Sequence, residues 1–217
     1  MHRTMTSKPK HKIKGVLFDF DGTLTYPGAI DYSAIKRELQ CPPDMPILEF
    51  LETLPPDKQA PLTAILEAKE EAAAQASLPN IGAEKCLSAL KKRGIPIGII
   101  TRNSMQSVRV ALEKFKEINL EDFPAVITRE QALPKPNPDG VYQAARRMGI
   151  STSQLLVVGD FRFDVMAGHA AGAQTALLKN SDRSVMIKGD PDPDFTVNHL
   201  EEILNLIDAF PSNDNHP

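Results

Sequence analysis

Two aspartates, Asp19 and Asp21, stand one residue apart at the end of a short apolar run over residues 16–18. The run is typical of a buried strand, and residues two positions apart in a strand project to the same side. We therefore expect both carboxylates at the carboxyl end of this strand, where open α/β sheets bind their ligands. Gly22 allows a sharp turn that brings backbone N–H groups close to a ligand. A plain Asp-Gly turn is the alternative interpretation.

A second polar cluster, Thr101-Arg102-Asn103, follows another apolar run over residues 95–100. A hydroxyl and free backbone N–H groups at the start of a helix form a cradle for a phosphate or an oxyanion. Thr101 is the main candidate, and Arg102 and Asn103 are candidates for contacting the substrate. The alternatives are that Asn103 or Ser104 only caps the next helix and that Arg102 is a surface arginine.

Lys135 lies in a loop with three prolines, Pro134, Pro136 and Pro138. Prolines reduce the conformational freedom of the loop, so we expect this lysine to be held more firmly than an ordinary surface lysine. A fixed ammonium group can neutralise a phosphoryl oxygen as a point charge. A solvated loop lysine is the alternative.

A second acidic pair, Asp160 and Asp164, follows the apolar run over residues 155–158. Asp160 is expected at a strand tip and Asp164 in the first turn of the next helix, so both side chains can converge on one cation. Metal binding is the favoured interpretation for Asp160. Asp164 has an alternative role as a negative charge favoured by the helix dipole.

The elements that carry these residues alternate between apolar strands and helices from residue 81 onward, which is typical of a parallel sheet covered on both faces. The expected strands after the first one are 95–100, 125–128, 155–158, 175–178 and an edge strand at 195–197. The expected helices are 83–93, 104–116, 138–148, 163–171 and 199–209. The aspartate-rich run 190–194 is interpreted as a solvated connector.

The segment from residue 26 to residue 80 contains no strand pattern. Capping residues and prolines divide it into expected helices at 31–40, 47–54 and 57–76. The sequence therefore predicts an all-helical insertion directly after the strand that carries Asp19.

Composition excludes several classes of protein. The chain has 217 residues, 41% of them hydrophobic, and a net charge of −3, which disfavours a duplex nucleic-acid binder. No apolar run is long enough for a membrane span, and the basic N-terminus lacks the apolar core of a signal peptide. Cys41 and Cys86 match no metal or disulfide pattern, in keeping with a cytoplasmic protein. The sequence makes no prediction about oligomeric state.

Taken in order, the motifs around Asp19, Thr101, Lys135 and Asp160 resemble the four motifs of the haloacid dehalogenase-like (HAD) hydrolase superfamily. Four motifs in the correct order are far more specific than any one of them. The helical insertion resembles the C1 cap of the phosphoglycolate phosphatase-like branch of this superfamily.

The resemblance implies a Rossmann-like α/β fold with strand order 3-2-1-4-5. The core domain would comprise residues 13–25 and 81–210, and the helical cap residues 26–80. Flexible tails are expected at residues 1–12 and 211–217.

The resemblance also assigns roles to the residues. Asp19 would be the nucleophile that forms an aspartyl-phosphate intermediate, which splits one difficult step into two. Asp21 would protonate the leaving oxygen and later take a proton from the attacking water. Gly22, Thr101, Arg102, Asn103 and Lys135 would bind the substrate, with Thr101 and Lys135 stabilising the transferring oxygens.

The resemblance implies a metal site as well. Its ligands would be the Asp19 side chain, the Asp21 backbone carbonyl and Asp160, with Asp164 bound directly or through water. Four carboxylates facing a phosphate with Lys135 as the main opposing charge would repel the substrate unless a hard cation were present. Oxygen ligands beside a phosphate favour Mg²⁺.

The expected function is a Mg²⁺-dependent phosphatase that hydrolyses a small phosphorylated metabolite, such as a phosphoglycolate-like compound or a sugar phosphate. A phosphotransferase or phosphomutase on the same core is one alternative. A catalytically idle binding protein of this fold is another, although the complete set of motif residues argues against it.

Overall fold

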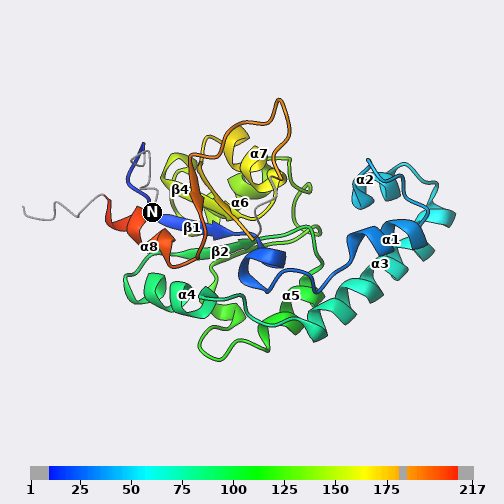
Figure 1. Ribbon diagram of the computed structural model, residues 1–217, viewed down its shortest axis with the longest axis horizontal. Helices are drawn as coiled ribbons and strands as arrows, with labels where there is room; N and C mark the ends of the chain where they lie inside the picture. Colours follow the sequence, from blue (N-terminus) through cyan, green and yellow to red (C-terminus); the bar gives the residue numbers. More distant parts are fainter. Residues whose placement is uncertain (1–9, 181–184, 210–217) are drawn as a thin grey trace, which may run out of the picture.

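The computed structural model, which describes residues 10–180 and 185–209, contains a single parallel sheet of six strands. The strand order is β3-β2-β1-β4-β5-β6, so β1 lies at the centre with β2 on one side and β4 on the other (Figure 1). The predicted order 3-2-1-4-5 is confirmed, and the predicted edge strand adds to it as β6. The strands are β1 Gly15–Phe18, β2 Ile97–Ile100, β3 Ala125–Ile127, β4 Leu155–Gly159, β5 Gln174–Leu178 and β6 Phe195–Val197.

Helices cover both faces of this sheet, as the apolar strands require. Alternate residues of β1 face opposite ways: Val16 and Phe18 pack into one cluster of buried residues and Leu17 into the other. The first cluster includes side chains from α4, α5 and α8, and the second from α6 and α7. These helices are α4 Ala83–Lys92, α5 Met105–Leu112, α6 Asp139–Met148, α7 Arg162–Ala170 and α8 Glu202–Asp208.

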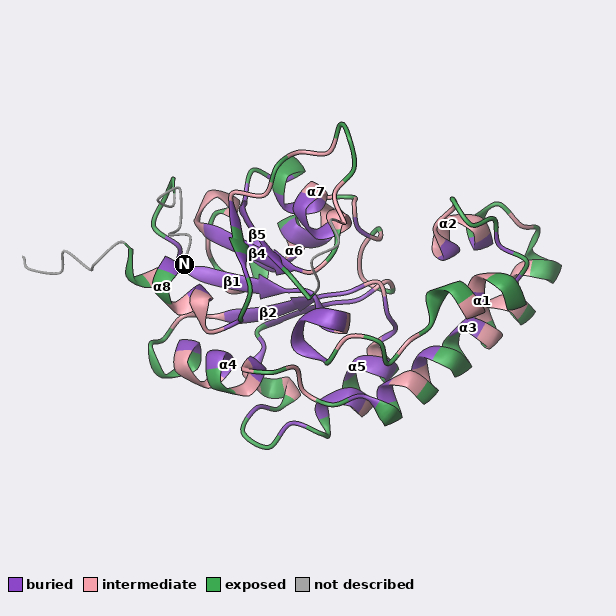
Figure 2. Cartoon of the chain, viewed as in Figure 1, coloured by how far each residue is buried: buried purple, intermediate pink, exposed green. Residues whose placement is uncertain are grey.

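The predicted helical insertion is present between β1 and α4. Its helices are α1 Tyr32–Glu38, α2 Ile47–Glu52 and α3 Pro56–Ala76, and they extend away from the sheet (Figure 1). They share a cluster of buried side chains separate from the two beside the sheet, whereas the central strands of the sheet are buried throughout (Figure 2). Helix α3 of the insertion packs against α5 of the core.

The two ends of the insertion run side by side. The Tyr26 N–H donates to the Leu78 carbonyl at 2.8 Å, and the Asn80 N–H donates to the Leu24 carbonyl at 2.8 Å. An isolated antiparallel bridge between Thr25 and Pro79 lies between these bonds. Both connections therefore leave the core at the same place, next to the end of β1.

Two helices that pack on the sheet, α5 and α8, are shorter than predicted by several residues, and side chains bind the backbone beyond one end of each. Helix α5 ends at Leu112 rather than Lys116, and the N–H groups of Lys116 and Glu117 donate to the Glu84 carboxylate instead. Helix α8 begins at Glu202 rather than His199. Its Glu202 carboxylate accepts from the two N–H groups just before the helix, those of residues 198 and 199.

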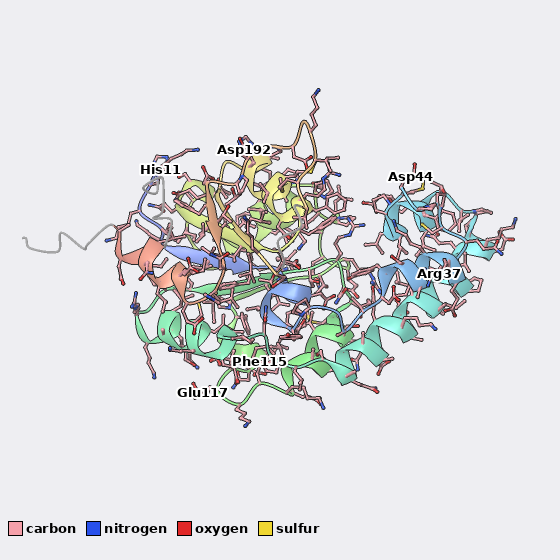
Figure 3. All side chains as sticks on the ribbon, viewed as in Figure 1. His11, Arg37, Asp44, Phe115, Glu117 and Asp192 are labelled. Atoms are coloured by element: carbon pink, nitrogen blue, oxygen red, sulfur yellow. The ribbon has the colours of Figure 1, made fainter. Side chains whose placement is uncertain are left out.

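The interpretation of residues 190–194 as a solvated connector is wrong for both of its ends. Asp190 pairs with Arg162, whose Nε donates to it at 2.8 Å. Asp194 accepts hydrogen bonds from the backbone N–H and the hydroxyl of Thr175 at 3.0 and 3.1 Å. Asp192, between them, lies on the outside of the core, away from the insertion (Figure 3).

The structure also bears on the expected tails, the two cysteines and the possibility of a membrane-spanning helix. Within the tail expected at residues 1–12, the Lys10 N–H donates to Gln174 at 2.8 Å. The tail expected at residues 211–217 lies outside the described residues. Cys41 and Cys86 are both buried free thiols. None of the helices in the described part of the chain combines the length and apolar character needed to cross a membrane.

Candidate active site

Three of the predicted acidic residues meet at the carboxyl end of the sheet. Asp19 directly follows β1, Asp160 follows β4, and Asp164 lies in the first turn of α7. One carboxylate oxygen of each lies within 4.8 Å of the others. These strands are paired, and the Asp19 N–H continues the pairing by donating to the Val158 carbonyl at 2.8 Å. The central position of β1 is thus what brings Asp19 into one site with Asp160 and Asp164, which follow it by 141 and 145 residues.

Lys135 is buried among these carboxylates. Its Nζ lies 2.5 Å from both Asp19 Oδ1 and Asp164 Oδ1, and it donates to the Ile100 carbonyl at 3.0 Å. Burial by itself lowers the pKa of Lys135, but Asp164 and Asp19 raise it on balance, so the ammonium stays charged. The alternative of a solvated loop lysine is excluded, because only 4% of this residue is exposed.

Asp164 has the helix-terminal role weighed for it, and its second oxygen faces the carboxylate cluster. One of its oxygens binds Lys135, while the other accepts the Phe161 N–H at 3.1 Å and caps the start of α7. Gly159 makes this close approach possible: a Cβ there would lie 2.1 Å from Asp164 Cγ. The side chain therefore faces the cluster because the helix N-terminus holds it there.

The Asp21 carboxylate is held from two sides. Asn103 Nδ2 donates to its Oδ2 at 2.7 Å from the core, and the Tyr32 hydroxyl donates to the same oxygen at 3.2 Å from helix α1. Burial raises the pKa of the Asp21 carboxyl to about 6, and the charge of Asp19 adds to this shift. A carboxyl in that range can exchange a proton near neutral pH. Tyr32 was not predicted, since nothing in the sequence links it to the end of β1.

Gly22 is required where it stands. Its φ of +74° lies in the left-handed region, and a Cβ would lie 2.3 Å from Asp160 Oδ2. Asn180 Nδ2 donates to the Gly22 carbonyl at 2.6 Å and to Asp160 Oδ2 at 2.9 Å. Asn180 is a second residue that the sequence reasoning missed; its position just after β5 was the available signal.

Thr101 is buried directly after β2. Its N–H donates to the Ile127 carbonyl at 2.9 Å, and its Oγ1 accepts the Asn103 N–H at 3.1 Å. Ser104, rather than Asn103, caps the next helix, because its side chain accepts the Ser107 N–H at 3.2 Å. The capping alternative is thus correct for Ser104 without displacing Thr101 from the site.

Arg102 lies between the core and the insertion. Its two terminal nitrogens donate to the Glu49 carboxylate of α2 at 3.0 and 2.5 Å, and its guanidinium stacks 5.3 Å from the centre of the Phe163 ring. It also binds the Lys135 carbonyl. The alternative interpretation was a surface arginine; in the structure the side chain is 20% exposed and is held by Glu49, a partner that only the folded chain reveals.

A second ion pair joins the insertion to the core. Arg129 Nη1 donates to both carboxylate oxygens of Glu70, at 2.8 and 2.7 Å. Glu70, on α3, is only 3% exposed, and burial raises its pKa to about 7 in spite of the arginine. Glu67, one turn earlier, is an exposed partner of the same arginine at 3.4 Å.

A cavity of about 600 Å³ opens between the carboxylate cluster and the insertion. Its floor includes all of the predicted site residues: Asp19, Asp21, Gly22, Thr101, Arg102, Asn103, Lys135, Asp160 and Asp164. Its walls include Tyr32, Lys36, Leu66 and Glu70 of the insertion. The volume is within the range of small-molecule sites.

Comparison with known proteins decides the family. The model of the haloacid dehalogenase-like hydrolase family matches residues 13–172. The chain belongs to the haloacid dehalogenase-like hydrolases. A relative from Saccharomyces cerevisiae, named as an uncharacterized hydrolase, is 32% identical over 201 residues, which cover 91% of this chain and 92% of the yeast protein.

Two further proteins are similar to this HAD-like hydrolase over most of its length. A putative pyrophosphatase PpaX from Clostridium perfringens is 29% identical over 219 residues, covering 92% of this chain and all of the bacterial one. The crystal structure of a predicted phosphoglycolate phosphatase from Haemophilus somnus has the same fold, with a TM-score of 0.70 at 18% identity, covering 91% and 99% of the two chains. This HAD-like hydrolase is therefore an enzyme with relatives named as phosphatases.

The acidic cluster of this HAD-like hydrolase fits a divalent cation. Burial, and after it the charge of Asp19, raises the pKa of Asp160 and of Asp164 in spite of the nearby Lys135, so a cation placed among these carboxylates would be favoured. Carboxylate oxygens grouped this closely are the ligands that hard cations prefer. The residues present thus match a divalent metal site built from Asp19, Asp160 and Asp164.

Proposed function

We propose that this chain is a Mg²⁺-dependent phosphatase that hydrolyses a small phosphorylated metabolite through an aspartyl-phosphate on Asp19. The convergence of Asp19, Asp160 and Asp164 with Lys135, beside Asp21, carries the proposal. The phosphatase names of several relatives support the same reaction class.

In the first step, a carboxylate oxygen of Asp19 attacks phosphorus and the bond to the leaving oxygen breaks. Asp21 gives its proton to that oxygen, which suits a carboxyl whose pKa lies at about 6. Asn103 and Tyr32 hold the Asp21 carboxyl in place for this transfer.

In the second step, water attacks the phosphorus of the aspartyl-phosphate. Asp21, now ionised, takes a proton from this water, and inorganic phosphate leaves as the Asp19 carboxylate is restored. Thr101 and Lys135 hold the transferring oxygens in both steps, with the ammonium offsetting their charge.

Mg²⁺ would be held by the Asp19 side chain, the Asp21 backbone carbonyl and Asp160, with Asp164 a direct ligand or one that acts through water. When bound, the ion offsets the charge of the phosphoryl group and of the carboxylates around it. This choice of metal follows from the all-oxygen donor set.

Residues 26–80 are proposed to act as a cap over the core formed by residues 13–25 and 81–210. Support comes from the cavity between the two parts and from the adjacent connections at Thr25 and Pro79. Such a cap excludes bulk water and contacts the leaving group.

The experiment is hydrolysis of p-nitrophenyl phosphate with Mg²⁺, comparing the wild-type chain with Asp19→Asn. The variant is expected to lose at least about 10³-fold in kcat, because an amide cannot carry the phosphoryl group. Asp57→Asn, an exposed aspartate in the first turn of α3, is the matched control and should retain activity. Equal release by wild type and Asp19→Asn would refute the proposal, and phosphoryl transfer without release of inorganic phosphate would indicate a phosphotransferase.

A further inference from the structure

The insertion contributes several aliphatic side chains to the wall of the cavity. Ile30, Ile47, Leu48 and Leu66 line it, and all four belong to the buried cluster of the insertion or pack against it. A leaving group attached to a phosphoryl group at Asp19 would extend toward this wall. Polar groups in such a wall are few, so each one restricts which leaving groups fit.

Most positive side chains that line the cavity already have carboxylate partners from the protein. Lys135 is paired with Asp19 and Asp164, as described above. Arg102 is paired with Glu49, and Arg162 with Asp190. A substrate anion at the far end of the cavity would compete with these carboxylates for any of the three cations.

Lys36 of α1 also lines the cavity, but its partner is a backbone carbonyl rather than a carboxylate. Its Nζ donates to the Pro43 carbonyl at 2.7 Å, which holds the side chain in place at the cavity wall. Within residues 10–180 and 185–209, no carboxylate oxygen lies within 4.0 Å of this nitrogen. The ammonium has three donors, so two remain available.

Asp44 is an acidic residue that also lines the cavity, and it follows Pro43 in the chain. It lies in the loop between α1 and α2, which also supplies Pro43 (Figure 3). It forms no ion pair with Lys36 in the structure, so the charge of the ammonium is not neutralised within the wall. A half-buried cation beside aliphatic side chains is a favourable partner for an anion, since the local dielectric is lower than in bulk water.

We propose that Lys36 binds a second negative charge on the leaving group, so that the preferred substrates are phosphomonoesters with another anionic group at the far end. This inference rests on the proposed phosphatase function and names its substrate class. A lysine is a point charge with rotatable donors, so it accepts either a carboxylate or a second phosphate. The pair of charges, one at the carboxylate cluster and one at Lys36, then orients the substrate along the cavity.

The test compares substrates that differ in one anionic group. The first arm compares 3-phosphoglycerate with glycerol 3-phosphate, which has a hydroxymethyl group in place of the carboxylate. The second arm compares fructose 1,6-bisphosphate with fructose 1-phosphate. For each pair, the measured quantity is a ratio of two kcat/KM values with Mg²⁺. The value for the ester with a second anionic group (the anionic member) is divided by the value for the ester without it (the neutral member). We expect the wild-type chain to favour the anionic member in at least one arm.

Lys36→Gln should lower that ratio about tenfold, because the positive charge that strengthens the hydrogen bond to the anionic group is lost. Lys36→Arg should restore most of it. Lys58→Gln is the matched control: it removes the same charge from an exposed lysine of the insertion outside the cavity lining, and should change the ratio less than about twofold. This control separates binding at Lys36 from a general change in the field of the insertion.

Two results would overturn the inference: no preference for the anionic member in either arm, or a preference that Lys36→Gln leaves unchanged. Failure of the phosphatase proposal is recognised separately, as background phosphate release from all four esters and from p-nitrophenyl phosphate. In that case calorimetry with Mg²⁺ gives the affinity of the chain for each ester. A higher affinity for the anionic member of a pair, reduced by Lys36→Gln, would support the inference, and equal affinities would overturn it.

Discussion

Glu70 offers a direct test of how the insertion is attached to the core. The carboxylate is buried, its two oxygens bind Arg129 at 2.8 and 2.7 Å, and Asp21 and Glu67 are its acidic neighbours. We expect burial to outweigh the arginine, so that the folded chain favours the protonated form. Glu70→Gln mimics that form, and its effect on stability should therefore depend on pH.

The magnitude follows from linkage between protonation and folding. The pKa of Glu70 lies at about 7 in the folded chain, against an ordinary value of 4.5. Its contribution to stability is fully present below pH 4.5 and is lost as the pH rises through 7, because the unfolded chain ionises first. At about 1.4 kcal/mol per pKa unit, the loss between pH 5 and pH 8 is about 2.5 kcal/mol. Glu70→Gln has no such loss.

The assay is urea unfolding of the wild-type chain and of Glu70→Gln at pH 5 and pH 8. From pH 5 to pH 8, the variant should gain about 2.5 kcal/mol in free energy of unfolding relative to wild type. All other titrating groups are common to both chains and cancel in this difference. Glu67→Gln is the control, since it removes an exposed partner of the same Arg129 and should show a change below about 0.5 kcal/mol. A Glu70→Gln variant that loses more stability at pH 8 than at pH 5 would show that the ion pair outweighs burial.

Two further predictions concern the residues around Asp160. Asn180→Ala should weaken Mg²⁺ binding about tenfold, measured by calorimetry, because the hydrogen bond that orients Asp160 at 2.9 Å is lost; unchanged affinity would exclude this positioning role. Gly22→Ala should lower the free energy of unfolding by about 1–3 kcal/mol in urea and also weaken Mg²⁺ binding, since the new Cβ would lie 2.3 Å from Asp160 Oδ2 at a φ of +74°. A Gly22→Ala chain with wild-type stability would contradict the steric argument.

The fold was predictable because its signals are local and repeated. Apolar strands such as β4 are buried on both faces, so continuous runs of valine and leucine mark them without knowledge of their neighbours. The ends of helices were less predictable. Helix α5 ends at Leu112 because Glu84, 28 residues earlier, binds the backbone beyond it, and that contact has no local signature.

The residues of the site also differ in how far the sequence could predict them. The side chains at the strand ends were predictable, since parallel strands bring their carboxyl ends to one edge of the sheet. Their partners were not: Tyr32 on Asp21, Glu49 on Arg102 and Asn180 on Asp160 join residues from different elements. A hydrogen bond between distant segments depends on how the segments pack, which the types of the two residues do not reveal.

The sequence by itself determined the chemistry that gathers at the sheet edge, because the order and spacing of acidic, hydroxyl and lysine side chains after apolar strands are written in the chain. Only the tertiary structure decided which charges remain available. It paired Arg102 with Glu49 and Arg129 with Glu70, and it left Lys36 at the cavity wall with a backbone carbonyl as its partner. Charge pairing depends on separations of a few ångströms, and these separations are fixed only when the insertion packs against the core.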